Sequence, residues 1–187
     1  MSMRTFLAVD LSKDVRKRLG IVQRSLGSEE FVIRWVAEPL RHITLRFIGD
    51  VSDKLAVDIC RTARDVVAGA SPFQVTVRGV ECIGKTEAKV RMIWAGVVDR
   101  DDGLGEIYRL LDDSLGQLGV DRERRPYKPH VTLGRVKVCR DGQALRKLAS
   151  PLAVTDFGSV DVQSITVYES TLTPAGPIYT PMATAPM

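Results

Sequence analysis

The order of the predicted elements runs twice along this chain, and the repetition limits the folds that it can adopt. An apolar strand ends at Asp10 and is followed by a helix, and a second apolar strand ends at Asp99 and is again followed by a helix. His42 follows Asp10 by 32 positions. His130 follows Asp99 by 31 positions, so both histidines fall at a matching place, each on a further apolar strand. The 187 residues include only these two histidines, so any imidazole chemistry must use this pair.

Helix signals follow both of the first strands, which we place at residues 6–9 and 90–98. Ser12 can cap a helix that Gly27 closes. Asp101 or Asp102 can cap the second helix, and Gly119 can close it. The apolar faces consist of Val15, Leu19, Val22 and Leu26 in the first helix, and of Leu104, Ile107, Leu111, Leu115 and Leu118 in the second.

Each histidine strand is followed by one more predicted helix, and the chain ends in strands. Ser52 caps the first of these helices, and the second covers residues 143–149. The stretch 160–171 predicts a strand that turns through 174–177 and returns from Ile178. The tail therefore adds further β structure to the chain.

The predicted fold class is α+β, with two pseudo-symmetric lobes of largely antiparallel sheet backed by helices and a groove between them. No low-complexity or Pro/Gly-rich linker divides the chain. We therefore expect one bilobal domain over residues 1–187, with approximate repeat halves at 1–70 and 72–187. At this length roughly 70% of the surface of the unfolded chain can be buried, so folding needs neither disulfides nor a structural metal.

Cysteine usage and hydropathy indicate a compartment. Cys60, Cys82 and Cys139 are odd in number and far apart, which argues against a disulfide framework or a zinc site. The first apolar run stops at Asp10, too early for a signal peptide, and no 18-residue apolar stretch occurs. We expect a soluble, cytoplasmic protein with no membrane contact. The net charge of +4 mildly favours an anionic partner such as nucleic acid, although many proteins of this charge bind none.

The candidate chemistry lies in two tetrads, His-Ile-Thr-Leu at 42–45 and His-Val-Thr-Leu at 130–133. Because strand side chains alternate, the histidine and threonine of each tetrad share one face, and the apolar residues point into the core. Cleavage of a phosphodiester needs a base and an acid, each typically worth ~10²–10⁴ in rate. Two imidazoles can supply both without a metal, and threonine hydroxyls can bind phosphate oxygens. A single strand histidine beside a threonine is ordinarily a satisfied polar residue, but the duplication favours catalysis.

With their flanking segments, the tetrads resemble the two-histidine phosphoesterase superfamily, and within it the RNA 2′,3′-cyclic phosphodiesterases, historically called 2′-5′ RNA ligases. The flanking segments are Arg4 to Asp10, Arg46 to Gly49, Pro129 with Gly134 and Arg135, and Ser170 to Tyr179. The resemblance spans nearly the whole chain. It implies a bilobal, pseudo-twofold fold, no cofactor, and opening of a 2′,3′-cyclic phosphate on RNA or oligonucleotide ends to leave a 2′-phosphate. Whether 2′-5′ ligation matters is left open.

The resemblance also implies roles for five residues. His42 is the expected proton donor and His130 the expected proton acceptor. Thr44 and Thr132 would hold the phosphate, and Arg135 would join them. Strict alternation places Arg135 on the face opposite His130, so this role requires a bend, a bulge or side-chain reach.

Two further substrate contacts are candidates. Phe6 could stack on a base at the edge of the groove, although an apolar residue in a first strand is more often core. Arg46 shares a face with His42 and could reach the groove, and a surface position is equally compatible. The basic cluster before His130 could line a path for RNA phosphates or form a solvated loop; it consists of Arg122, Arg124, Arg125 and Lys128.

Two alternatives belong to other classes. Residues 79–86 match Gly-x₄-Gly-Lys-Thr, the phosphate-binding loop, but that motif functions only where the loop leads from a strand into a helix. Strand patterns on both sides predict a hairpin turn at 84–86 instead. The other alternative is an RNA-end or nucleotide binding module that lacks turnover. The sequence does not define the physiological substrate or the oligomeric state.

Overall fold

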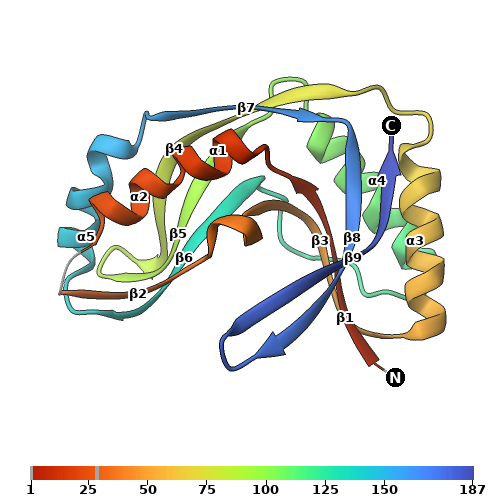
Figure 1. The fold of residues 1–187 in the computed structure, drawn as a ribbon, viewed down its shortest axis with the longest axis horizontal. Coiled ribbons are helices and arrows are strands. Elements are labelled where there is room, and N and C mark those ends of the chain that lie inside the picture. Colours follow the sequence, from red (N-terminus) through yellow and green to blue (C-terminus); the bar gives the residue numbers. More distant parts are fainter. Residues whose placement is uncertain (1, 28–29) are drawn as a thin grey trace.

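The computed structural model describes residues 2–27 and 30–187, and in these residues nine strands form one antiparallel sheet (Figure 1). The strands are β1 (Ser2–Asp10), β2 (Phe31–Trp35), β3 (His42–Ser52), β4 (Phe73–Thr86), β5 (Lys89–Val98), β6 (His130–Cys139), β7 (Asp156–Val162), β8 (Ser164–Thr173) and β9 (Gly176–Pro186). The helices are α1 (Lys13–Arg18), α2 (Gly20–Ser25), α3 (Asp53–Val67), α4 (Gly103–Gln117) and α5 (Gly142–Ala149), with 3-10 turns η1 (Glu38–Leu40) and η2 (Ser150–Leu152). The α+β prediction is confirmed. None of the helices in these residues has the length and apolar character of a membrane span.

The sheet has two parts that meet at its centre. Its strand order is β7-β4-β5-β6-β3-β1-β8-β9, with β2 pairing on β6. Helices α3 and α4 pack together and cover the part that holds β3, whereas α5 packs on β4 and α1 on β7 (Figure 1). Each helix that links a first strand to a histidine strand therefore lies on the other part of the sheet. Because β8 and β9 also join β1, each part of the sheet contains strands from both halves of the sequence. The division into repeat halves 1–70 and 72–187 remains a prediction.

The first predicted helix forms as two short helices. The Ser12 hydroxyl accepts a hydrogen bond from the N–H of Val15 at 3.3 Å, which confirms the predicted cap. The helix is interrupted at Leu19, between α1 and α2. All four apolar residues predicted to face the core are buried, so the predicted face is right although the helix is not continuous.

The cap of α4 differs from the prediction. Asp102 has a left-handed backbone with φ 54°, and its side chain makes no capping hydrogen bond. The Asp99 carboxylate caps the helix instead, accepting from the N–H groups of Gly103 at 3.1 Å and Leu104 at 2.8 Å. At the other end, Gly119 has φ 83°, the left-handed conformation that closes a helix, as predicted.

Two predicted strand boundaries are wrong. The stretch 160–171 divides at Gln163, so that β7 pairs with β4 at one edge of the sheet and β8 pairs with β1 in the other part. The hairpin between β4 and β5 turns at Glu87 and Ala88, not at 84–86. Gly84 lies within β4, where a Cβ would collide with the carbonyl of Lys89. Since β4 leads into another strand, residues 79–86 do not form the strand-to-helix turn of a phosphate-binding loop.

Candidate active site

The two histidine strands meet at a single bridge. Ile43 of β3 is the antiparallel partner of Val131 of β6, and both side chains are fully buried. In this register His42 lies opposite Thr132 and Thr44 lies opposite His130, all on the face that points away from Ile43 and Val131. Directly opposed side chains in a sheet have Cβ atoms about 4.5–5.5 Å apart. The bridge therefore brings the two His-x-Thr motifs together.

A β-bulge follows each motif at the same place. In β3, Thr44 pairs with Ala8 and Arg46 with Leu7, which leaves Leu45 as the extra residue. In β6, Thr132 pairs with Trp94 and Gly134 with Ile93, which leaves Leu133 as the extra residue. Leu45 and Arg46 are both buried, as are Leu133 and Gly134, so the alternation of faces reverses after each bulge. The residues that share the histidine face beyond the bulges are Phe47 and Arg135, both exposed.

Both imidazoles are held in the same orientation. His42 Nδ1 lies 2.8 Å from the carbonyl oxygen of Leu40, and His130 Nδ1 lies 2.8 Å from that of Lys128. A carbonyl can only accept, so Nδ1 carries the proton in each ring and Nε2 is the nitrogen that exchanges protons. His42 Nε2 lies 3.0 Å from the hydroxyl of Thr44.

Aromatic side chains support each histidine. The ring of His130 stacks on Trp94 with a centroid distance of 3.6 Å. The ring of His42 stacks on Phe6 at 5.0 Å and meets the edge of Tyr179 at 5.5 Å. These contacts restrict rotation of the imidazoles, so the two Nε2 atoms keep fixed positions.

Burial lowers the pKa of both histidines. For His42, burial is the largest cause; Arg16 and His130 lower its pKa further, whereas the Leu40 carbonyl and Asp10 raise it. For His130, burial again comes first, Lys128 lowers the pKa, and the Lys128 carbonyl and Glu81 raise it. A lowered histidine pKa favours the neutral ring at neutral pH, which suits a general base. A carboxylate opposes this shift at each ring, but Asp10 has a larger effect on His42 than Arg16 does, whereas Glu81 has a smaller effect on His130 than Lys128 does.

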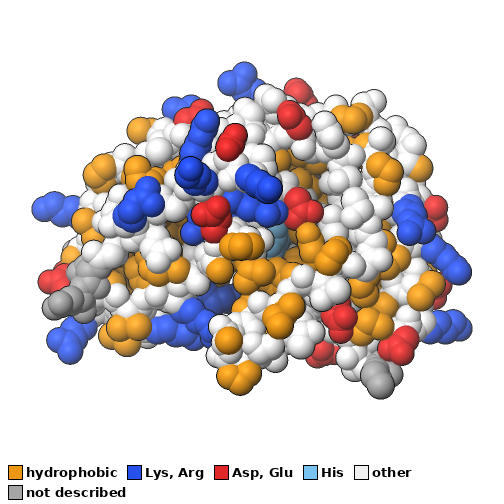
Figure 2. Space-filling model, viewed as in Figure 1, with side chains coloured by type: hydrophobic (Ala, Val, Ile, Leu, Met, Phe, Trp, Pro, Cys, Tyr) orange, Lys and Arg blue, Asp and Glu red, His pale blue; other side chains and the backbone are white. Residues whose placement is uncertain are grey.

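A hollow of about 260 Å³ opens beside His130 on the histidine face. Figure 2 shows histidine at the floor of a depression near the centre of this face, edged by hydrophobic and charged side chains. The hollow is lined by Thr44, Leu45, Arg46, Phe47, Trp94, Tyr108, Glu123, Arg125, Pro126, Tyr127, Lys128 and His130. A second hollow, of about 520 Å³ beside α2, contains none of the predicted site residues.

Comparisons with known proteins agree with this geometry. A model of the 2′-5′ RNA ligase superfamily matches residues 34–172. A protein of Methanothermobacter thermautotrophicus named RNA 2′,3′-cyclic phosphodiesterase is 35% identical, over 97% of both chains. The chain belongs to the 2′-5′ RNA ligase superfamily. A Thermotoga maritima member with the same name is 34% identical, over 95% of this chain and 91% of its own. The crystal structure of TT0787 of Thermus thermophilus has the same fold, with a TM-score of 0.82, 23% identity, and coverage of 98% of this chain and 97% of that one.

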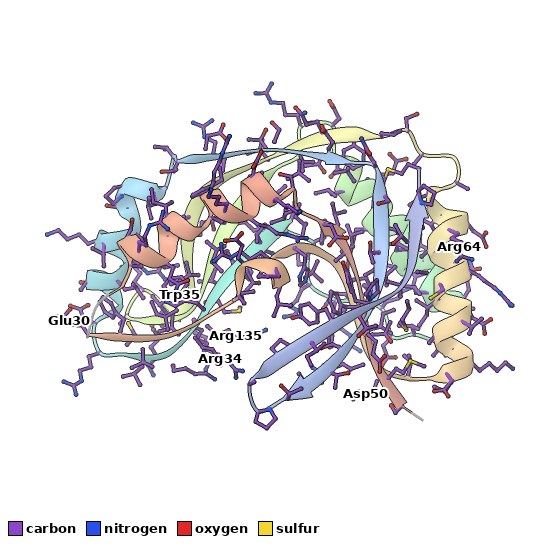
Figure 3. The ribbon with its side chains drawn as sticks, in the orientation of Figure 1. Glu30, Arg34, Trp35, Asp50, Arg64 and Arg135 are labelled. Atoms are coloured by element: carbon purple, nitrogen blue, oxygen red, sulfur yellow. The ribbon has the colours of Figure 1, made fainter. Side chains whose placement is uncertain are left out.

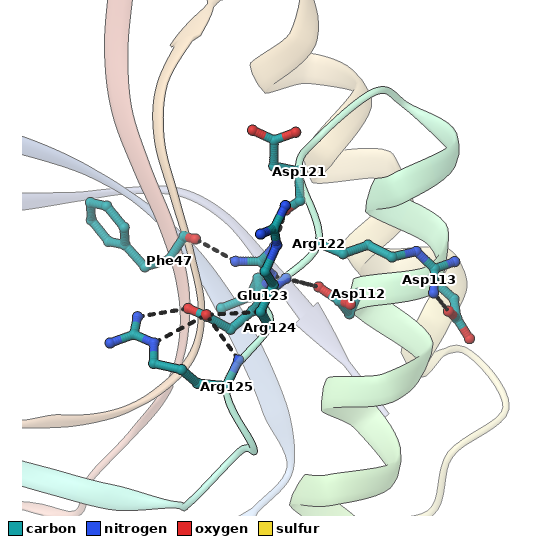
Figure 4. Close-up of polar contacts among 9 residues, drawn as sticks. Phe47, Asp112, Asp113, Asp121, Arg122, Glu123, Arg124 and Arg125 are labelled. Carbon is teal, nitrogen blue, oxygen red and sulfur yellow. Dashed lines mark hydrogen bonds and ion pairs between the residues drawn. The ribbon is translucent and has the colours of Figure 1, made fainter.

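In this 2′-5′ RNA ligase superfamily member, the remaining predicted residues, Arg135, Phe6 and Arg46, lie in three different environments. Arg135 lies on the histidine face because of the bulge that its role requires. Phe6 is 4% exposed and supports His42 from within the sheet, so it is core. Arg46 is 6% exposed; its guanidinium donates to the carboxylate of Asp112 at 2.8 Å and to backbone carbonyls of Phe47 and Asp121 (Figure 4). Arg46 therefore anchors the wall of the hollow.

The basic cluster is largely neutralised by ion pairs. Arg122 pairs with Asp113 and Arg125 with Glu123, each at 2.8 Å (Figure 4). Lys128 pairs with Glu81 at 2.7 Å. The cluster is part of the loop that borders the hollow, and a path for RNA phosphates along it remains a prediction.

Sequence reasoning missed the aromatic residues of the site. Trp94 lies on β5, and Tyr168 and Tyr179 lie on β8 and β9, far along the chain from His42. Tyr168 stacks on Phe6 at 5.2 Å. For Trp94, a usable signal was its alternation with the buried residues of the returning strand, which places it on the histidine face.

Proposed function

We propose that this chain hydrolyses the 2′,3′-cyclic phosphate end of RNA to a 2′-phosphate end, with His42 as proton donor and His130 as proton acceptor and without a metal. The observation that carries the proposal is the bridge between Ile43 and Val131, which sets two His-x-Thr motifs against each other with both Nε2 atoms oriented alike. The curated relatives, with their shared name, support the same activity. The cysteines of the described residues are free thiols, in keeping with the reducing cytoplasm where we place the enzyme.

The proposed step is an in-line displacement at phosphorus. Nε2 of neutral His130 removes a proton from water as the water oxygen bonds to phosphorus. The bond from phosphorus to the 3′ oxygen breaks, and protonated Nε2 of His42 gives its proton to that oxygen. The product carries a 2′-phosphate and a 3′-hydroxyl. The hydroxyls of Thr44 and Thr132 and the Arg135 guanidinium would bind the phosphate oxygens as charge develops on them.

The residues opposite the two histidines support this division of roles. Asp10 is the register partner of His42 across β1 and β3, whereas Gly96 is the partner of His130 across β5 and β6. The Asp10 carboxylate accepts hydrogen bonds from Tyr168 at 2.8 Å and from Thr166 at 3.0 Å. A fixed carboxylate stabilises the protonated form of a nearby imidazole; Glu81 does so for His130, but there the charge of Lys128 has the larger and opposite effect. The two His-x-Thr motifs do not differ in themselves, so it is the neighbouring Asp10 that favours the acid role for His42.

An Asp10→Asn variant tests this division. The amide keeps one oxygen, which can accept from Tyr168 or from Thr166, and removes the charge that raises the pKa of His42. We expect the pKa of His42 to fall and the limb of the pH–rate profile that requires its protonated form, the high-pH limb, to move to lower pH. Because the chain has two histidines, each ring can be assigned by NMR and its titration followed directly.

The control for this variant is Asp14→Asn, which removes an exposed carboxylate from α1 and should change neither the titration nor the profile. An Arg16→Gln variant should act in the opposite direction, since Arg16 lowers the pKa of His42. An unchanged His42 titration in Asp10→Asn, or movement of the low-pH limb alone, would contradict the assignment of His42 as the acid.

The function itself is tested with RNA that ends in a 2′,3′-cyclic phosphate, in the presence of EDTA. We expect conversion to a 2′-phosphate end, resolved from the 3′-phosphate isomer by chromatography. A 3′-phosphate product would place the acid beside the wrong oxygen. Tight binding of a 2′-phosphorylated end with no turnover would instead support the binding module, and dependence on added divalent metal would overturn metal independence.

A further inference from the structure

Two arginines lie side by side on the histidine face, beyond the catalytic motif of β6. Arg34 of β2 is the antiparallel partner of Arg135 of β6, so the two side chains leave the sheet on the same face (Figure 3). Both are exposed. Among the described residues neither arginine has an acidic partner within ion-pair distance. Like charges directly opposite each other destabilise a sheet unless an anion lies between them.

The pair is directed toward the active site. The charge of Arg135 reaches Tyr179, whose pKa it lowers against the larger raising effect of burial, and Tyr179 contacts His42. A Cβ placed on Gly176, the first residue of β9, would lie 3.7 Å from a terminal nitrogen of Arg34. The β8–β9 hairpin therefore borders the arginine pair on the side of Arg34, and the catalytic motif of β6 borders it on the side of Arg135 (Figure 3).

The two directions away from the histidines differ in chemistry. Phe47 on β3 occupies the position that corresponds to Arg135 on β6, five residues after the histidine in each case. Beyond Phe47 the hollow contains the stacked rings of Tyr108 and Tyr127, with centroids 4.5 Å apart. On the β6 branch, the residue beyond Arg135 is Arg34, on β2. The β3 branch holds Arg4 over the Phe47 ring at 4.8 Å, and its Arg125 and Lys128 are in ion pairs, whereas the β6 branch sets two guanidiniums side by side. A polyanion is therefore favoured along the β6 branch.

We propose that Arg34 binds the internucleotide phosphate that precedes the cyclic end, while Arg135 beside it binds the cyclic phosphate, so that the enzyme selects oligonucleotides over cyclic mononucleotides. This rests on the proposed function, which places the cyclic phosphate at the histidines. The RNA chain continues only on the 5′ side of that end, and its next phosphate is a fixed anion. Two guanidiniums present paired donors that match phosphate oxygens.

The test compares three substrates: a nucleoside 2′,3′-cyclic monophosphate, a dinucleotide ending in a 2′,3′-cyclic phosphate, and the same dinucleotide with an uncharged methylphosphonate linkage. Arg34→Gln should lower kcat/KM about tenfold for the charged dinucleotide, the effect of one charge-assisted hydrogen bond, and leave the other two substrates unchanged. The salt dependence of log kcat/KM for the charged dinucleotide should lose about one unit of slope. Arg64→Gln, on exposed α3, is the matched control and should change nothing.

Equal losses on all three substrates, or wild-type turnover that is indifferent to the methylphosphonate, would overturn the subsite. If wild type hydrolyses none of the three, the proposed function fails. Equilibrium binding of the two dinucleotides then decides the subsite separately: wild type should bind the charged linkage more tightly and Arg34→Gln should not. Equal binding of both dinucleotides by wild type would reject the subsite.

Discussion

His42→Ala and His130→Ala are each expected to lower kcat by about 10²–10⁴-fold on RNA with a 2′,3′-cyclic phosphate end. Each change removes one of the two proton transfers and leaves the phosphate contacts in place. The two losses should not add in the double variant, because a displacement that lacks its acid gains little from its base. The measurement is single-turnover hydrolysis over pH 4–9, an interval of roughly two to three units on each side of the ordinary histidine pKa.

The pH profiles separate loss of catalysis from loss of structure. Wild type should give a bell, His130→Ala should lose the low-pH limb, and His42→Ala should lose the high-pH limb. Unfolding curves should remain close to wild type, since neither ring is part of the buried apolar core. Full activity in either variant, or a wild-type rate that changes in one direction only, would contradict acid–base catalysis by this pair.

Asp112→Ala is expected to destabilise the fold by about 3 kcal/mol, a loss typical of leaving a buried charge without its partner. Asp112 accepts from Arg46 at 2.8 Å, and the two side chains are 13% and 7% exposed. It also accepts from the N–H of Glu123 at 3.3 Å, so the loop at the hollow should loosen as well. The midpoint of thermal unfolding should fall by roughly 6–12 °C.

A matched control lies one residue further along the chain. Asp113 pairs with Arg122 at the same distance, 2.8 Å, but both side chains are at least 60% exposed (Figure 4). Asp113→Ala should therefore cost less than about 1 kcal/mol. If the two variants unfold at the same temperature, the Arg46 pair has no structural role beyond that of a surface ion pair.

Much of the site was predictable from the sequence because the chemistry is duplicated. The spacing of His42 and His130 after matching strands predicted that they would meet, and alternation predicted that Thr44 and Thr132 would share their face. The shared face follows from short-range alternation, whereas the meeting of the histidines follows from the repeated order of elements. The apolar partners Ile43 and Val131 form the bridge itself, so the same residues that made the tetrads recognisable also join the sheet.

The rest depended on contacts that local pattern does not encode. Arg46 was expected to face the groove or the solvent, but the bulge at Leu45 turns it inward, and its partner Asp112 is 66 residues away. The cap of α4 moved to Asp99 because the carboxylate at that position can reach two N–H groups of the first helical turn at once. The chain divides at Gln163 because β7 pairs with β4 at an edge of the sheet and β8 pairs with β1 in its other part, and these partners are set by the tertiary fold.

The sheet order determines when the catalytic machinery can exist during synthesis. β1 is made well before β8, which covers its second edge. Tyr168 and Tyr179, which pack against Phe6 and His42, arrive with that tail. A nascent or truncated chain that already contains both histidines still lacks the strands that fix one of them. Activity on RNA ends is thus expected only after β8 and β9 have been made.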